Sequence, residues 1–112
     1  MSNYDYVLEV YHYDPFKDEE LEDRRKLYYN LAGLSSEDIL DDFAKANAAI
    51  DTCRSMVRLE KLNKLRIDIE KSGDVNVKEL KCITDLQQTE RKNIALQGKE
   101  HGFTKKYNLS KG

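Results

Sequence analysis

The stretch SSEDILDDFAKANAAIDTCRSMVRLEKLNKLRIDIEK, from Ser35 to Lys71, decides the fold because it lacks proline and glycine and is rich in helix formers. Ser35 is a candidate N-cap, and Glu37 stands in the first turn. Gly73 can supply the left-handed conformation that ends a helix. One helix over this stretch would be about 55 Å long, whereas a compact domain of this size is about 34 Å across. We therefore expect a projecting helix whose apolar stripe needs packing partners.

An apolar stripe with heptad spacing runs along the first part of this helix and predicts a packing seam. Its members are Ile39, Phe43, Ala46, Ile50, Cys53 and Val57. After Val57 the apolar positions shift to another face, which is typical of a stutter or a change of packing partner. These later positions are Leu59, Leu62, Leu65 and Ile69. Two interpretations stay open: the seam lies within one chain, or part of it is an interface between subunits.

The composition favours a helical protein with a large surface. The 112 residues are 39% hydrophobic and 36% charged, with one proline and five glycines, which leaves little turn chemistry for an all-β fold. No apolar run approaches the ~20 residues of a membrane span, and no signal peptide is evident. We expect no membrane association and a reducing cytoplasm, with Cys53 and Cys82 as buried thiols outside any metal-ligand spacing.

The charge is distributed unevenly along the chain. Residues 1–51 carry 13 acidic and 5 basic side chains, a balance of −8, whereas residues 52–112 carry 8 acidic and 14 basic ones, a balance of +6. Opposite charge on the two halves suits two different partners or neighbouring subunits that dock unlike ends, although it also suits plain solubility.

The first 13 residues allow two local structures. Tyr4, Tyr6, Leu8 and Val10 alternate with other residues as in a strand, but a helical turn fits equally well. Because no second strand is predicted, we expect an extended or short helical arm. Asp14-Pro15 then predicts the start of a helix that runs to about Leu31.

A second long helix is predicted after Gly73. Asn76 and Glu79 resemble a capping box at its start, and Gly98 is expected to end it after about Gln97. The remainder, residues 99–112, is expected to be a flexible basic tail.

These elements predict an all-α fold in three parts. Residues 1–34 form an arm and a short acidic helix packed at one end, residues 35–98 form a long antiparallel helical hairpin, and residues 99–112 form the tail. The hairpin and subunit seams are expected to use Ile39, Phe43, Ile50, Cys53, Val57, Leu80, Ile83, Leu86 and Ile94. So thin a layer leaves apolar surface open, which favours a homo-oligomer, and a closed ring in particular.

Catalysis finds no support in the sequence. His12 and His101 stand near opposite ends, and no phosphate-binding loop, paired cysteine ligands or nucleophile elbow is present. We therefore predict no enzymatic activity, no cofactor and no metal site. The junction over residues 31–39 superficially resembles a helix-turn-helix, but acidic side chains would face the DNA, so we reject that reading. The acidic side chains that would face the DNA are Glu37, Asp38, Asp41 and Asp42.

Basic residues give the better functional signal. Arg54, Arg58, Lys61 and Lys64 share one side of the long helix, with Arg66 close by. The tail adds Lys105, Lys106 and Lys111. These eight residues are candidate phosphate contacts without base-reading specificity, and a merely solvated helix face is the alternative.

The layout between Asp14 and Gly102 resembles the small terminase subunits of tailed bacteriophages. The resemblance lies mainly in Ser35 to Ile50, in the segment VKEL from Val77, and in the segment QQTERK from Gln87. It implies long antiparallel hairpins in closed rings of about 8 to 12 subunits, located in the host cell cytoplasm. It also implies binding of viral double-stranded DNA and regulation of the large terminase subunit, which holds the ATPase and nuclease.

The chain departs from many members of that family because it lacks a convincing N-terminal helix-turn-helix. A rival hypothesis is a small helical adaptor or inhibitor that binds a single protein partner through its acidic N-terminal half.

Overall fold

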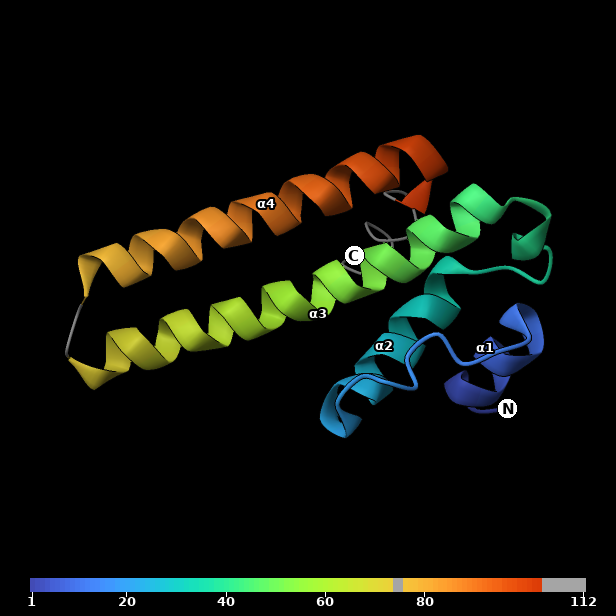
Figure 1. Ribbon diagram of the computed structural model, residues 1–112, viewed down its shortest axis with the longest axis horizontal. Helices are drawn as coiled ribbons and strands as arrows, with labels where there is room; N and C mark the ends of the chain where they lie inside the picture. The colour runs from blue at the N-terminus through green and yellow to red at the C-terminus, as the bar shows by residue number, and fades with distance from the viewer. Residues whose placement is uncertain (74–75, 104–112) are drawn as a thin grey trace.

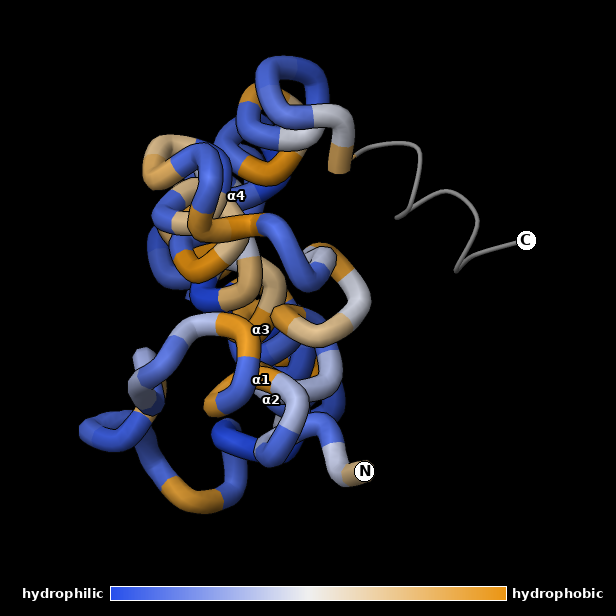
Figure 2. The backbone as a smooth tube through the Cα atoms, turned by 90° about the vertical axis from the view of Figure 1, so that its right-hand side faces the viewer, coloured by the Kyte–Doolittle hydropathy of each residue, from blue (hydrophilic) through white to orange (hydrophobic). Residues whose placement is uncertain are grey.

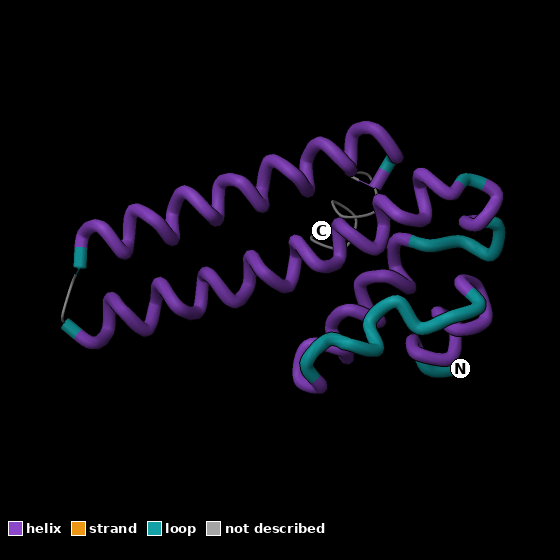
Figure 3. Tube along the Cα trace, in the orientation of Figure 1, coloured by secondary structure: helices purple, strands orange, loops and turns teal. Residues whose placement is uncertain are grey.

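The computed structural model describes residues 1–73 and 76–103, and within these ranges every regular element is helical (Figures 1 and 3). Along the chain these elements are α1 (Asn3–Tyr11), α2 (Leu21–Leu34), the short 3-10 helix η1 (Ile39–Asp41), α3 (Phe43–Ser72) and α4 (Val77–His101). The prediction of an all-α fold is therefore confirmed. None of the described helices is both long enough and apolar enough to cross a bilayer.

The long helix begins later than predicted, at Phe43 and not at Ser35. Asp42 caps it, because its carboxylate accepts a 3.1 Å hydrogen bond from the Lys45 backbone N–H. Ser35 instead follows the end of α2, where its hydroxyl donates to the Leu31 carbonyl at 2.6 Å. The expected N-cap is thus used to finish the preceding helix, and α3 has 30 residues and a length of about 45 Å.

The N-terminal arm is a helix, so the strand alternative is wrong. The Ser2 hydroxyl caps α1 by accepting from the Asp5 backbone N–H at 3.1 Å, and His12 ends it with a left-handed φ of 65°. Its buried side is formed by Val7, Val10 and Tyr11.

The acidic helix α2 begins at Leu21 and not at Pro15. The Asp14 carboxylate accepts from the Phe16 backbone N–H at 2.9 Å, which folds the chain into a turn before the helix starts. Phe16 itself is fully buried. A turn in this segment places the Phe16 ring inward, and the burial of so large a ring outweighs a longer helix.

The hydrophobic core lies at one end of the molecule. It joins residues of α1, α2, the first half of α3 and the segments between them. Its most enclosed side chains are Val7, Phe16, Leu27, Leu31 and Cys53. Phe103, beyond the predicted end of the second long helix, is also buried in this core. Burial strongly raises the pKa of the Cys53 thiol, whereas Cys82 is exposed, contrary to our expectation of two buried cysteines.

The helices α3 and α4 lie side by side and run in opposite directions (Figure 1). The Asn93 amide donates to the Ser55 hydroxyl at 2.7 Å, and the Arg58 guanidinium contacts the Glu90 carboxylate at 2.9 Å. The pair dominates the elongated outline, which measures 49 × 29 × 26 Å. The part of this helix pair that lies away from the core is thin, because none of the described residues from 58 to 82 is buried.

Helix α4 also ends later than predicted. Gly98 is a buried position inside the helix, and the left-handed residue that follows the helix is Gly102, with a φ of 80°. The boundary expected after residue 98 therefore falls within α4.

The predicted seam residues divide between the core and the surface. Ile39, Ile50, Cys53 and Val57 belong to the single core, so at these positions the seam lies within one chain. Ile83 is buried, and Leu80 and Ile94 are half-buried. Phe43 and Leu86 remain 72% and 49% exposed, and no described element covers them.

Loss of the cap at the start of α4 is expected to destabilise the protein modestly. The Asn76 side chain accepts from the backbone N–H groups of Lys78 and Glu79, at 3.1 and 3.2 Å. Asn76→Ala should therefore lower the free energy of unfolding by about 1 kcal/mol, measured by urea denaturation. Asn76→Asp keeps an acceptor and should retain most of the stability. Equal losses in the two variants would contradict the capping role.

Candidate functional site

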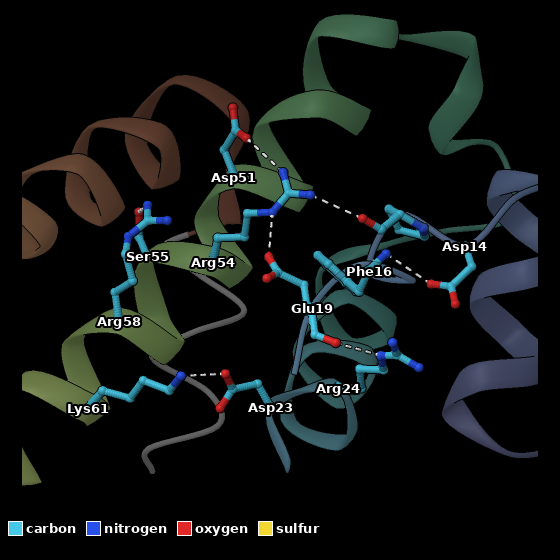
Figure 4. A network of polar contacts seen from close by, with 11 residues as sticks. Asp14, Phe16, Glu19, Asp23, Arg24, Asp51, Arg54, Ser55, Arg58 and Lys61 are labelled. Carbon is cyan, nitrogen blue, oxygen red and sulfur yellow. Dashed lines mark hydrogen bonds and ion pairs between the residues drawn. The ribbon is translucent and has the colours of Figure 1, made fainter. Parts of the chain in front are cut away.

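The predicted basic side of α3 is largely occupied by ion pairs within the chain (Figure 4). Arg54, Arg58 and Lys61 each contact at least one carboxylate. Their partners come from the turn before α2, from α4 and from α2 respectively. These three residues thus lie on one helix, as predicted, but each of them forms an ion pair within the chain.

Arg54 fastens the turn before α2 onto α3. Its guanidinium donates to the Glu19 carboxylate at 3.1 Å and to the Pro15 carbonyl at 3.0 Å. It also stacks over the Phe16 ring, 5.6 Å from the centroid, and lies 3.7 Å from Asp51. Because its donors are used inside the molecule, Arg54 is poorly placed to bind phosphate.

Lys61 joins α3 to α2. Its ammonium lies 2.5 Å from the Asp23 carboxylate and 3.6 Å from Glu20. The hydrogen bond from Lys61 to Asp23 raises the pKa of the lysine. Lys26 and Glu60 form a further pair between the same helices, at 3.1 Å. All the side chains in these pairs are exposed except that of Asp23, which is 13% exposed. Surface pairs of this kind contribute little stability, but they leave Lys61 partly neutralised.

A polar layer separates the middle of α3 from the middle of α4. Ser55 is fully buried and accepts from Asn93, while Arg58 contacts both Glu90 and Ser55. Gln87 is only 2% exposed, yet its side-chain nitrogen has no hydrogen-bond partner. One oxygen of Glu90 is likewise buried and unpaired. Sequence reasoning missed this layer, although the polar block from Gln87 to Asn93 signals that this part of α4 has no continuous apolar face.

The basic side chains that remain available to an external anion lie at the distal end of α3 and α4, near the connection between these two helices. Lys64 is exposed and has no ion pair in the described part of the chain. The same holds for Lys71 on α3 and for Lys78 and Lys81 on α4, which flank the connection between the helices. Arg66 is half-buried and donates to Asn63 at 2.8 Å. Of the predicted α3 set, only Lys64 is therefore free to contact an external anion. Lys78 and Lys81 of α4, which the predicted set does not include, lie exposed as well.

The remaining predicted phosphate contacts are in the tail. Lys105, Lys106 and Lys111 lie outside the described residues.

Comparisons of this chain with protein-family models, with curated proteins and with solved structures found no match. Any functional assignment therefore rests on the residues and their arrangement.

Proposed function

We propose that this protein is a homo-oligomeric DNA-packaging protein of the small-terminase kind. In this proposal the oligomer is a ring that binds viral double-stranded DNA and regulates a large terminase subunit with ATPase and nuclease activity. The single observation that supports it best is the absence of any buried residue in the described part of the segment from 58 to 82.

Two helices that pack mainly against each other cannot bury enough apolar surface to be independently stable. The distal pair leaves Leu65, Val77 and Leu86 exposed by 46%, 75% and 49%. The layer between the middle of α3 and the middle of α4 is polar and not fully satisfied, so it adds little stability. Association with further copies of the chain is the simplest way to cover such a projection, and it is the expected role of a ring.

The charge distribution supports DNA contact at the distal end. Lys64, Lys71, Lys78 and Lys81 are exposed and free of ion pairs in the described part of the chain, so they can neutralise phosphates on binding. An oligomer repeats this set in every subunit. Contacts of this kind supply affinity without reading bases, because none of these four lysines lies on a recognition helix.

Variants of the exposed lysines test the DNA contact. We expect Lys64→Ala, combined with alanine at Lys71, Lys78 and Lys81, to reduce the slope of log K against log salt concentration by about 0.9 for each lost phosphate contact. Lys61→Ala is the matched control for the single variant Lys64→Ala. The Lys61 ammonium is already paired with Asp23, so this control should leave DNA affinity unchanged. Fluorescence anisotropy with a labelled duplex at several salt concentrations measures both. Equal effects of the Lys61 and Lys64 single variants would contradict the proposed contact set.

The mass in solution tests the oligomer. A ring of about 8 subunits or more has a mass of roughly 100 kDa, against 13.1 kDa for one chain. Light scattering at dilute concentration distinguishes the two, and a well-folded single chain would contradict the proposal.

A second candidate function is a helical adaptor that binds one protein through its acidic N-terminal half. The observation that favours it is Phe43, whose ring is 72% exposed. Exposed carboxylates precede it on the segment between α2 and α3; they are Glu37, Asp38, Asp41 and Asp42. An exposed ring beside acidic groups suits a basic partner surface. A monomer without DNA affinity would favour this function.

A further inference from the structure

Helix α4 carries two stripes at heptad spacing, each apolar at its ends and polar in its middle, and only one of them packs against α3. The inner stripe faces α3 and passes through Leu80, Ile83, Gln87, Glu90 and Ile94, all of which are buried or half-buried. A second set with the heptad spacing of a coiled-coil seam lies one residue earlier at each step. It consists of Cys82, Leu86, Thr89, Asn93 and Leu96. One residue corresponds to about 100° around an α-helix, so the second set lies on the flank of α4 and not on the side that packs against α3.

The second set is open to solvent in the described structure. Leu86 and Leu96 are 49% and 53% exposed, and Cys82 and Thr89 are exposed as well. We call these four residues the outer stripe. Asn93 completes the spacing but is half-buried because it donates to Ser55. Hydrophobic and hydrophilic segments alternate along α4 (Figure 2), and the leucines of the outer stripe are exposed whereas the polar Gln87 is buried.

We infer that the outer stripe is a contact between subunits, in which it packs antiparallel against the outer stripe of a second copy of this chain. The inference rests on the oligomeric state in the proposed function and specifies one of its interfaces. A heptad seam is complementary to itself, because each apolar side chain packs between those of an identical helix. A two-fold axis at the level of residue 91 places Leu86 of each copy on Leu96 of the other.

The charges beside the stripe support this alignment. Asp85 and Lys99 are exposed and have no ion pair within the described chain. Both lie on the side of the stripe that points away from α3, where antiparallel helices bring equivalent flanking positions together. The alignment therefore brings Asp85 alongside Lys99 of the second copy, and the two-fold axis forms this pair twice. The two Lys92 side chains meet near the axis, and their repulsion weakens the contact.

A two-fold contact joins subunits in pairs, so an assembly that contains it has an even number of subunits. Closure into a ring then needs another surface. The exposed Phe43 and Leu65 lie outside the outer stripe and remain available for it.

Charge exchange gives the decisive test. We expect Asp85→Lys and Lys99→Asp each to raise the dissociation constant of the pair about tenfold, since each turns two attractions into two repulsions. The double variant should return to about the wild-type value, because the pairing is restored with its signs exchanged. Arg91→Asp, on the opposite side of α4, is the matched control for a change of charge and should have little effect. Sedimentation equilibrium of the full chain measures all four.

Two further variants test the apolar part and the axis. Leu86→Glu should abolish pairing, whereas Val77→Glu, at a more exposed position away from the stripe, should not. Lys92→Gln should tighten the pair by relieving the repulsion at the axis. Circular dichroism checks that each variant keeps its helix content.

The outcomes separate the interface from the function. If the wild type is oligomeric but none of the charge variants changes its mass, the stripe is not the interface, and the proposed oligomer stands. If the single variants weaken pairing and the double variant does not restore it, the antiparallel alignment is wrong. If the wild type is a monomer, both proposals fail. If pairing follows the expected pattern and DNA binding is absent, the inference holds and the packaging function fails.

Discussion

Replacing Phe16 by alanine is expected to lower the free energy of unfolding by about 3 to 5 kcal/mol. The Phe16 ring is fully buried, lies 5.8 Å from the Tyr28 ring between centroids, and carries the Arg54 guanidinium over its face. Its loss leaves a cavity at the junction of α2, α3 and the turn before α2, and it removes the surface on which Arg54 rests. Since domains of this size are stable by only about 5 to 15 kcal/mol, the variant should be close to unfolding.

Phe43 provides the matched control for this prediction. It is the same residue type, but 72% exposed, so Phe43→Ala should change the free energy of unfolding by about 0.5 kcal/mol or less. Urea denaturation followed by circular dichroism at a dilute concentration compares the two variants. Similar losses would show that the Phe16 side chain does not hold the core together.

Stability is expected to fall in alkaline solution because of Tyr11. Burial raises the pKa of Tyr11 to about 12 from an ordinary value of 10.0. A folded-state pKa above the unfolded one leaves stability intact below pH 10 and reduces it as the pH rises towards 12, because only the unfolded tyrosine loses its proton there. The loss attributable to Tyr11 at pH 11.5 should be about 2 kcal/mol.

The variant Tyr11→Phe isolates this contribution. Tyr11 shares a 2.8 Å hydrogen bond with Ser35, so the variant should lose about 1 kcal/mol at pH 8. Between pH 8 and pH 11.5, however, it should lose about 2 kcal/mol less than the wild type does. Burial and the Asp14 carboxylate also raise the pKa of Tyr28, which titrates in both proteins and cancels in the comparison. Parallel pH curves for the two proteins would contradict the prediction.

The helical class could be predicted from the sequence because it depends on local features. The absence of proline and glycine between Ser35 and Lys71 and the cap at Asn76 act within a few residues. The start of α3 could not be predicted in the same way. Ser35 and Asp42 are both good N-cap residues, and Ser35 is held at the end of α2 by its contact with Tyr11, 24 positions earlier in the chain.

The candidate site shows the same division. The spacing of Arg54, Arg58 and Lys61 correctly predicts that they lie on one helix, yet it contains no information about their partners. Glu19 lies 35 positions from Arg54, and Glu90 lies 32 positions from Arg58. Whether a cation is free to bind phosphate is decided by such distant contacts. The sequence likewise does not show that Lys71, Lys78 and Lys81, near the connection between α3 and α4, have no ion pair in the described part of the chain.

The confinement of the core to one end has a consequence for motion. The protection of an amide from hydrogen exchange depends on the opening of lowest free energy that exposes it. Regions with few buried contacts open without global unfolding. The halves of α3 and α4 that lie far from the core should thus unfold and refold locally as a separate cooperative unit, while the end that contains Phe16 and Leu31 stays folded. The distal end of α3 and α4 can therefore adjust its conformation to a partner at a low cost in free energy, while the core end keeps its structure.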